Sequence, residues 1–207
     1  METIRLTQEN FDETVARASA VLRSGGVILY PTDTLYGLGA DAFSDEAVTK
    51  IYAIKGRDEK KPIHCIVPDM RTAEQYAEVN DLAQKFAQKF MPGPLTLVLK
   101  KKANIDSGIV KGMTTIGIRI PQNKFCLDLA RAFGPYTTTS ANVAGAADLR
   151  SVPEILAQLG ERASLIDLII DAGELPERKP STVVDVCSGE AHMLREGAIS
   201  AAEISQV

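Results

Sequence analysis

Lysine and arginine residues concentrate in one short segment of the sequence. Lys55-Gly56-Arg57 and Lys60-Lys61 place four cations within seven residues of a chain whose net charge is −4. Fixed cations at such spacing can bind phosphate or carboxylate groups, and preorganised charge is a major source of catalysis. The alternative is structural, because cations at a helix C-terminus interact favourably with the helix dipole. For this cluster taken alone, the structural explanation is the better one.

A run of hydroxyl side chains ends in an amide at Thr137-Thr138-Thr139-Ser140-Ala141-Asn142. Hydroxyl and amide groups can hydrogen-bond a polar ligand. Serine and asparagine also bond to nearby backbone in capping turns. Neither this run nor the cation cluster specifies a function by itself.

The segment Thr115-Ile116-Gly117-Ile118-Arg119-Ile120 has the alternation of a β-strand. A period of two places the three isoleucines on one face and Thr115, Gly117 and Arg119 on the other. The isoleucine face belongs to the core. The second face is either open to solvent or lines a polar cleft where the arginine fork could bind a carboxylate or phosphate. We favour the cleft, because solvent-facing strands more often carry threonine and lysine.

Several common catalytic motifs are absent from the sequence. Neither G-x-x-x-x-G-K-[ST] nor G-x-G-x-x-G occurs, which removes support for a P-loop or Rossmann site. Only His64 and His192 are available for a catalytic triad, and G-x-S-x-G and H-E-x-x-H are missing. The three cysteines are far apart and lack C-x-x-C spacing, so we expect free thiols and no protein-held metal. A mechanism without a protein nucleophile is indicated.

Length and composition indicate one domain spanning residues 1–207, with 45% hydrophobic residues. No apolar run approaches the roughly 20 residues that a membrane helix needs, so we expect a cytoplasmic protein with no membrane contact. The net charge of −4 disfavours strong nucleic-acid binding. Lys100-Lys101-Lys102 is more simply the solvated end of a strand.

Hydrophobic periodicity predicts alternating helices and strands. We expect helices over 10–23, 45–55, 81–90, 124–133 and 153–159 and near the C-terminus, and strands over 27–30, 62–67, 95–100, 115–120, 136–139, 165–170, 182–186 and 192–194. The segment 31–39 is interpreted as a polar loop. This alternation predicts an α/β protein, with a mixed sheet because several connections are too short for parallel crossovers.

Seven segments, in order along the chain, resemble motifs of the YrdC family. They are Pro31-Thr32-Asp33-Thr34-x-Tyr36-Gly37-Leu38-Gly39, the pair Lys55 and Arg57, Pro92-Gly93-Pro94 with Thr96, 115–121, the pair Ser140 and Asn142, 180–185, and Leu194-Arg195-Glu196-Gly197. The resemblance implies a single-domain form with a twisted open sheet and a large concave electropositive cleft. It also implies a reaction in which L-threonine, bicarbonate and ATP give threonylcarbamoyl-adenylate and pyrophosphate. Magnesium would accompany the ATP, and the product would serve the modification of adenosine 37 in tRNA by downstream proteins.

The resemblance implies roles for particular residues. Catalysis would depend on Lys55, Arg57, Ser140 and Asn142. ATP would contact Arg57, Lys61, Thr115, Ser140, Asn142 and Arg195. Threonine would contact Thr34, Arg119, Thr138 and Ser181, with Arg119 holding its carboxylate.

Two positions depart from the family pattern. The family often has a histidine at the position of Ile66, at the threonine site, whereas this chain has His64 two residues earlier. A shift of two residues keeps a strand side chain on the same face, so His64 is a further candidate for the threonine site. The usual serine-glycine-x-proline-serine pattern is replaced by Ala144-Gly145-Ala146-Ala147-Asp148.

Two alternative functions remain open. One is a YrdC-fold protein that binds nucleotide or double-stranded RNA without efficient synthesis. The other is an RNA-binding accessory protein, and weak binding of tRNA is compatible with the synthase as well. Retention of Lys55, Arg57, Ser140 and Asn142 favours the synthase.

Overall fold

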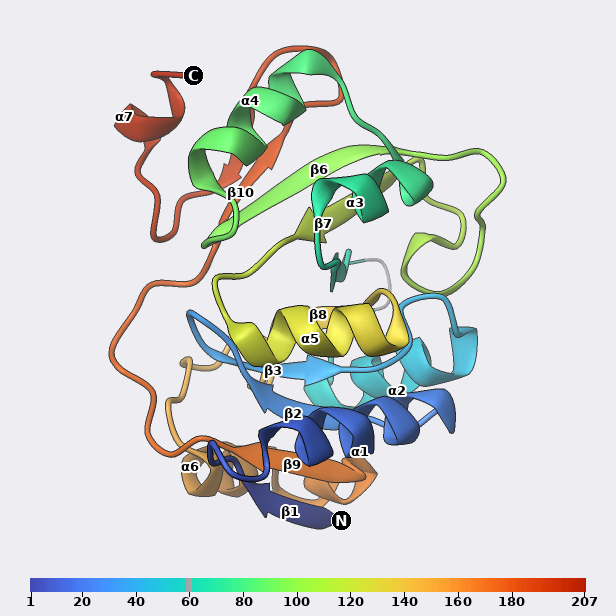
Figure 1. Ribbon diagram of the computed structural model, residues 1–207, viewed down its shortest axis with the longest axis vertical. Coiled ribbons are helices and arrows are strands. Elements are labelled where there is room, and N and C mark those ends of the chain that lie inside the picture. The colour runs from blue at the N-terminus through green and yellow to red at the C-terminus, as the bar shows by residue number, and fades with distance from the viewer. Residues whose placement is uncertain (59–60) are drawn as a thin grey trace.

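A single mixed sheet runs through the length of the molecule (Figure 1). The computed structural model describes residues 1–58 and 61–207. In this part of the chain the strand order is β1-β9-β2-β3-β8-β4-β7-β6-β10-β11, and β5 pairs with β6 beside this path. The strands are β1 (Glu2–Arg5), β2 (Ile28–Pro31), β3 (Tyr36–Gly39), β4 (His64–Ile66), β5 (Ala77–Glu78), β6 (Leu95–Lys101), β7 (Thr115–Arg119), β8 (Tyr136–Ser140), β9 (Leu168–Asp171), β10 (Thr182–Asp185) and β11 (His192–Arg195). The sheet contains both parallel and antiparallel pairs, which confirms the expected mixed α/β sheet.

Helices pack on both faces of this sheet. They are α1 (Phe11–Arg23), α2 (Asp45–Lys55), α3 (Met70–Tyr76), α4 (Asp81–Phe90), α5 (Lys124–Phe133), α6 (Val152–Leu159) and α7 (Ala201–Ile204), with 3-10 turns at Gly108–Val110 and Gly160–Leu165. The Ser44 side chain accepts a hydrogen bond from the Ala47 amide and begins α2, as expected from its N-cap position. Gly56 ends α2 in the left-handed region, where glycine carries no Cβ penalty. No helix in the described ranges is long and apolar enough to cross a bilayer.

The prediction of a loop over 31–39 is wrong for its second half. Residues Tyr36–Gly39 form β3, which pairs antiparallel with β2, so only the turn between them is irregular. Glycines in this strand mark a close approach of side chains, because a Cβ at Gly37 would lie 3.0 Å from Cζ of Tyr30. The short elements β1, α3 and β5 were not expected either.

A second difference concerns the strand predicted over 165–170. The chain forms a 3-10 turn over Gly160–Leu165, and β9 begins at Leu168. The apolar residues Leu165 and Ile166 suggested strand structure, but their backbone lies in and just after a tight turn that leaves Leu165 41% exposed. The helices predicted over 81–90 and 124–133 are confirmed with the same bounds.

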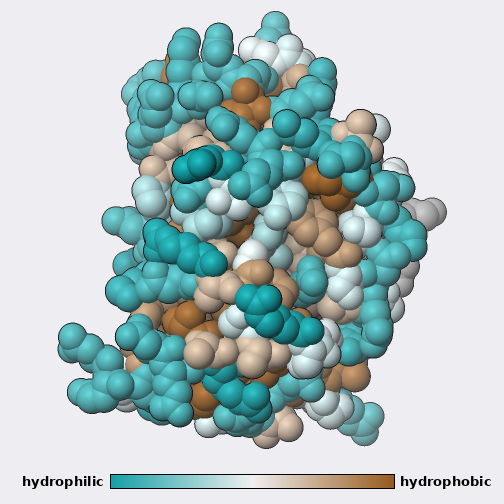
Figure 2. Space-filling view, turned by 45° about the vertical axis from the view of Figure 1, so that its right-hand side comes forward, coloured by the Kyte–Doolittle hydropathy of each residue, from teal (hydrophilic) through white to brown (hydrophobic). Residues whose placement is uncertain are grey.

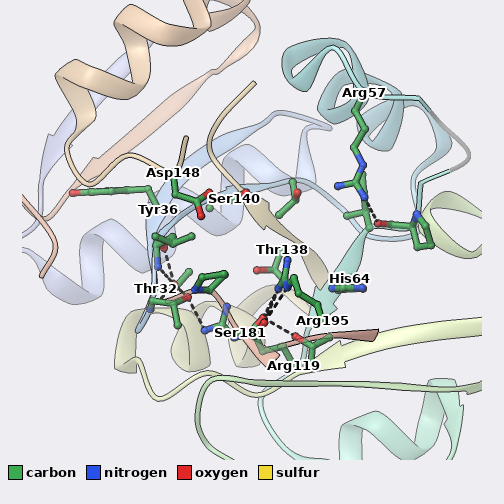
Figure 3. A pocket seen from close by; sticks show the side chains of 18 residues that line it. Thr32, Tyr36, Arg57, His64, Arg119, Thr138, Ser140, Asp148, Ser181 and Arg195 are labelled. Carbon is green, nitrogen blue, oxygen red and sulfur yellow. Dashed lines mark hydrogen bonds between the residues drawn. The ribbon is translucent and has the colours of Figure 1, made fainter. Parts of the chain in front are cut away.

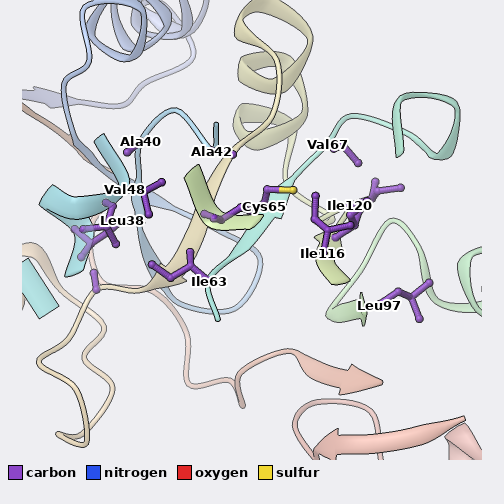
Figure 4. Packing of buried hydrophobic residues seen from close by; sticks show 14 of the residues in the cluster. Leu38, Ala40, Ala42, Val48, Ile63, Cys65, Val67, Leu97, Ile116 and Ile120 are labelled. Carbon is purple, nitrogen blue, oxygen red and sulfur yellow. The ribbon is translucent and has the colours of Figure 1, made fainter. Parts of the chain in front are cut away.

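Two apolar clusters lie on opposite faces of the sheet. The larger contains Leu38, Cys65, Leu97, Ile116 and Ile118, on the face packed by α2, α3, α4 and α6 (Figure 4). The smaller joins Ile28, Tyr30 and Ile66 to side chains of α1 and α5. The prediction that the three isoleucines of the β7 segment face the core is confirmed.

The smaller cluster covers only part of its face of the sheet, and a cavity lies over the rest of that face. On β8, Tyr136 is buried in the smaller cluster, whereas Thr138 and Ser140 on the same face line a cavity. On β4, Ile66 lies in the cluster and His64 lines the cavity. Because alternate residues of a strand share a face, one strand supplies the core at one end and the cavity at the other.

Candidate active site

A cavity of about 300 Å³ lies over β3, β4, β7 and β8, next to the segment that enters β10 (Figure 3). Its lining residues are Thr32, Thr34, Leu35, Tyr36, Gly37, Arg57, Pro62, Ile63, His64, Thr96, Arg119, Thr138, Thr139, Ser140, Asp148, Pro180, Ser181 and Arg195. They come from segments that are far apart in the sequence. Figure 2 shows a largely hydrophilic face of the molecule, on which apolar residues form small patches. The polar cleft expected beside β7 is therefore present.

Three arginines among the described residues line this cavity. Arg57 follows α2, Arg119 ends β7 and Arg195 ends β11. Burial lowers the pKa of Arg57, and burial lowers that of Arg195, with the Arg119 and Arg57 charges acting in the same direction. Converging cations that repel one another favour an anion placed between them.

Arg119 is held in place by two residues of the β2–β3 turn. Its Nη2 donates to Asp33 Oδ1 at 2.5 Å and to Thr34 Oγ1 at 2.9 Å. Asp33 Oδ2 accepts from the Gln122 amide at 3.1 Å, so the carboxylate is fixed from two sides. Within the described residues, the buried Nε atoms of Arg119 and Arg57 have no hydrogen-bond partner. Asp33 therefore occupies only part of the Arg119 fork.

Hydroxyl groups surround the guanidinium groups. Arg195 donates from Nη2 to the Ser181 carbonyl at 2.7 Å and to Ser181 Oγ at 3.1 Å. Ser181 Oγ also lies 3.1 Å from Thr96 Oγ1, and both residues are buried. Thr34 and Thr138 are less than a tenth exposed and line the same cavity. These buried hydroxyls are suited to orient a small polar ligand.

Lys55 lies behind the cavity wall instead of lining it. Its side chain is 2% exposed, and Nζ donates to Ser140 O at 2.5 Å, Asn142 O at 3.0 Å and Asn142 Oδ1 at 3.0 Å. An ammonium group has three donors, so these bonds use all of them. Burial, followed by the Arg57 charge, lowers the pKa of Lys55 to about 8. In this arrangement Lys55 positions Ser140 and Asn142.

Three predicted contact residues lie outside the cavity lining. Lys61 is exposed, and Thr115 begins β7 opposite Lys100. Lys60 of the predicted cation cluster lies outside the described residues. Asn142 is buried and accepts a 2.7 Å hydrogen bond from Ser140 Oγ, so it acts on the cavity through Ser140 and Lys55.

His64, and not Ile66, lies at the cavity. A Cβ at Gly117 on the neighbouring strand would overlap the imidazole carbons Cδ2 and Cγ, so the ring packs directly against that glycine. Burial lowers the pKa of His64 to about 4, and the charges of Arg195, Arg57 and Arg119 add to this effect. The imidazole is consequently neutral near pH 7.

Two acidic residues belong to the site but were not predicted as site residues from the sequence. Asp33 stands in the quoted segment Pro31-Thr32-Asp33-Thr34, so its position next to a functional threonine was the available signal. Asp148 lines the cavity, and its sequence context of small residues carried no such signal.

Comparison with known proteins agrees with this geometry. Residues 20–197 match the model of the Sua5/YciO/YrdC family, whose description is telomere recombination. The chain belongs to this family. The resemblance inferred from the ordered motifs is thereby confirmed.

Sequence alignments with individual members of the family cover most of this chain. A protein from Methanocaldococcus jannaschii is 41% identical over 176 residues, covering 85% of this chain and 82% of the relative. A mouse protein named threonylcarbamoyl-AMP synthase is 35% identical over 198 residues, covering 92% of this chain and 69% of the mouse protein.

The structure of Pyrococcus abyssi Sua5 complexed with L-threonine superimposes with a TM-score of 0.87 at 31% identity. The match covers 99% of this chain and 59% of Sua5, so the present chain spans about three fifths of that relative's length. The twisted open sheet with helices on both faces is therefore the fold of the Sua5/YciO/YrdC family.

Proposed function

We propose that this protein is a threonylcarbamoyl-AMP synthase. It uses L-threonine, bicarbonate and ATP to form threonylcarbamoyl-adenylate and pyrophosphate. The observation that carries the proposal is the convergence of Arg57, Arg119 and Arg195 on one cavity rich in hydroxyl groups. The mouse relative named for this activity and the threonine complex of the Pyrococcus abyssi relative support it.

The proposed chemistry joins two anions. The threonine amine and bicarbonate form a carbamate with loss of water. A carbamate oxygen then attacks the α-phosphorus of ATP, and the bond from that phosphorus to the oxygen bridging the β-phosphate breaks. Pyrophosphate leaves with the electron pair. No protein nucleophile takes part, which fits the absence of a nucleophile motif in the sequence.

The arginines supply what such a reaction requires. Carbamate and triphosphate repel each other, and fixed positive charge in a site shielded from water offsets this repulsion. Arg57 and Arg195, together with Ser140, would hold the nucleotide, while Lys55 and Asn142 would keep Ser140 in position.

A second set of residues would bind threonine. Thr34, Thr138 and Ser181 offer hydroxyls, and Arg119 would take the substrate carboxylate with the donors that Asp33 leaves free. His64 would form part of the wall next to the amino acid. Holding the reactants in a productive geometry is worth several orders of magnitude in rate.

Magnesium would enter with ATP. Across the described ranges, no three His, Cys, Asp or Glu residues are placed to hold a metal ion. The ion would take its ligands from the phosphates and solvent, and no step is assigned to a protein-held metal. Delivery of the product to downstream tRNA-modification proteins, weak binding of tRNA and a cytoplasmic location stay predictions from the sequence.

A pyrophosphate-release assay tests the proposal. Purified protein with ATP, magnesium, bicarbonate and L-threonine should release pyrophosphate, and omission of threonine should abolish release. Arg57→Ala should lower the rate about 100-fold or more, because it removes fixed charge from the site. Arg131→Ala is the matched control, since Arg131 pairs with Asp128 on the exposed side of α5.

Two outcomes would reject the assignment. Equal release without threonine would show that the amino acid is not a substrate. Salt-sensitive RNA binding without threonine-dependent turnover would instead support the alternative of a YrdC-fold RNA-binding protein. Faster turnover with serine would keep the adenylylation chemistry and change only the amino-acid specificity.

A further inference from the structure

Asp148 carries a carboxylate on the wall of this arginine-lined cavity. Asp148 lines the cavity, and no hydrogen bond or ion pair to its carboxylate is found among the described residues. Asp33, a second acidic residue near the cavity, forms an ion pair with Arg119. Figure 3 shows Asp148 on the same side of the cavity as Tyr36 and Ser140, away from Arg57 and His64. Its carboxylate is thus available to a ligand.

The loop that carries Asp148 is tied down on both sides of it. Before Asp148, the Ala146 carbonyl accepts from Asn142 Nδ2 at 2.8 Å and the Ala147 carbonyl accepts from Gln158 Nε2 at 3.2 Å. After it, the Arg150 carbonyl accepts from the Leu175 amide at 2.9 Å. These bonds hold the backbone on both sides of Asp148, an exposed residue at the rim of the cavity that it lines.

The carboxylate acts electrostatically on two cations of the site without contacting them. The Asp148 charge raises the pKa values of Lys55 and Arg195, in opposition to the effect of burial. Asp148 lines the same cavity as Ser140 and as Arg195, the expected phosphate-binding arginine. A negative charge at this place repels phosphate and carbamate, so it must face another part of the substrates.

The remaining groups of the substrates differ in how well they suit a contact with the Asp148 carboxylate. The threonine amine becomes part of a carbamate anion during the reaction, so a carboxylate beside it would oppose the product of that step. The ribose of ATP stays neutral throughout and offers two adjacent hydroxyl donors. A carboxylate can accept from both, as acidic residues do for ribose hydroxyls in dinucleotide-binding folds.

We infer that the Asp148 carboxylate accepts hydrogen bonds from the 2′- and 3′-hydroxyls of the ATP ribose. It thereby selects ribonucleotides over deoxyribonucleotides. This inference rests on the proposed use of ATP. It assigns Asp148 to sugar recognition, whereas the phosphates are left to Arg57 and Arg195.

The test compares the affinities of ATP, 2′-deoxy-ATP and 3′-deoxy-ATP by calorimetry, without threonine or bicarbonate so that no turnover occurs. The wild-type protein should bind ATP about 10- to 100-fold more tightly than either deoxy analogue, the range expected for a hydrogen bond to a charged group. Asp148→Ala should lower this ratio to about one, because it removes two hydrogen bonds to ATP but only the single remaining one to each deoxy analogue. Asp148→Asn should give an intermediate ratio.

Glu174→Ala is the matched control. Glu174 pairs with Arg150 at 2.8 Å, so its removal disturbs the same loop while the Asp148 carboxylate stays. The wild-type preference should persist in this variant. Loss of the preference in Glu174→Ala would show that loop order, and not the carboxylate, sets selectivity, and would overturn the inference.

Two further results would overturn it. One is an unchanged preference in Asp148→Ala. The other is an equal loss of affinity for all three nucleotides that excess magnesium restores, which would mark Asp148 as a contact of the metal–phosphate group. Threonine-dependent pyrophosphate release is measured separately, so failure of the proposed function is distinguished from failure of ribose recognition.

Discussion

The Arg119 guanidinium donates a 2.5 Å hydrogen bond to the Asp33 carboxylate, and these side chains are only 6% and 4% exposed. Both charges are removed from water, which is costly unless each compensates the other. The pair joins the end of β7 to the turn between β2 and β3. It holds a cation at the cavity while leaving part of the guanidinium fork for a substrate.

The first prediction follows from this burial. Asp33→Ala should lower the free energy of unfolding by about 3–5 kcal/mol, because it leaves the Arg119 charge buried and unpaired. Urea denaturation measures the change. The control is Glu2→Ala, which removes the exposed Glu2–Arg17 pair and should cost at most about 1 kcal/mol. Equal losses for the two variants would contradict the role of burial.

A second prediction concerns Lys55. Lys55→Met keeps the apolar part of the side chain and removes three hydrogen bonds to Ser140 and Asn142. Residues 142–148 should become less ordered, with amide hydrogen exchange at Ala146 about 10-fold faster. Pyrophosphate release should fall as Ser140 loses its position.

The control for Lys55 is Lys50→Met on the same helix. Lys50 bonds to the Gly25 carbonyl and pairs with Glu46, away from the loop. Its replacement should leave exchange at Ala146 unchanged. A Lys55 variant with wild-type exchange but lost activity would point instead to a direct contact between Lys55 and substrate.

The third prediction is a pH dependence of stability that arises from His64. Its folded-state pKa of about 4 lies below 6.5, the ordinary pKa of histidine, so the unfolded chain binds more protons between these values. Stability therefore falls as the pH drops from 6.5 to 4, and protonation in both states ends the effect below that window. The contribution amounts to roughly 3 kcal/mol.

Comparison with a variant isolates this contribution. Unfolding free energies of the wild-type protein and of His64→Asn are measured at each pH. The wild-type value minus the variant value should fall as the pH drops across that window. The same substitution at the exposed His192 should give a much smaller dependence. A flat difference for His64 would show that its ring is hydrated and free to protonate.

A fourth prediction tests the packing of His64 on Gly117. Gly117→Ala should destabilise the protein by about 1–3 kcal/mol, because the added Cβ overlaps the imidazole. In the His64→Ala background the same change should cost much less. The coupling energy from the double-mutant cycle measures the contact, and additive effects would argue against it.

The sequence alone determined most of the elements and the family of this protein. Helical and strand periodicity located α4 and α5 with their bounds, because each buries one clear apolar face. Alternation along β7 placed Arg119 on the face opposite the isoleucines, and the structure places it at the cavity. The family followed from ordered motifs, which are local in the chain.

Only the tertiary structure decided which role each of these residues has in the site. Lys55 and Arg57 are two positions apart, yet one is enclosed by backbone acceptors and the other lines the cavity. Whether His64 or Ile66 faces the cavity depends on how far α1 and α5 cover the sheet. Asp33 is paired with Arg119, 86 residues away in the sequence. Asp148 has no hydrogen-bond or ion-pair partner in the part of the chain that the structure describes. Periodicity gives the face of a residue, but its charge environment is set by long-range packing.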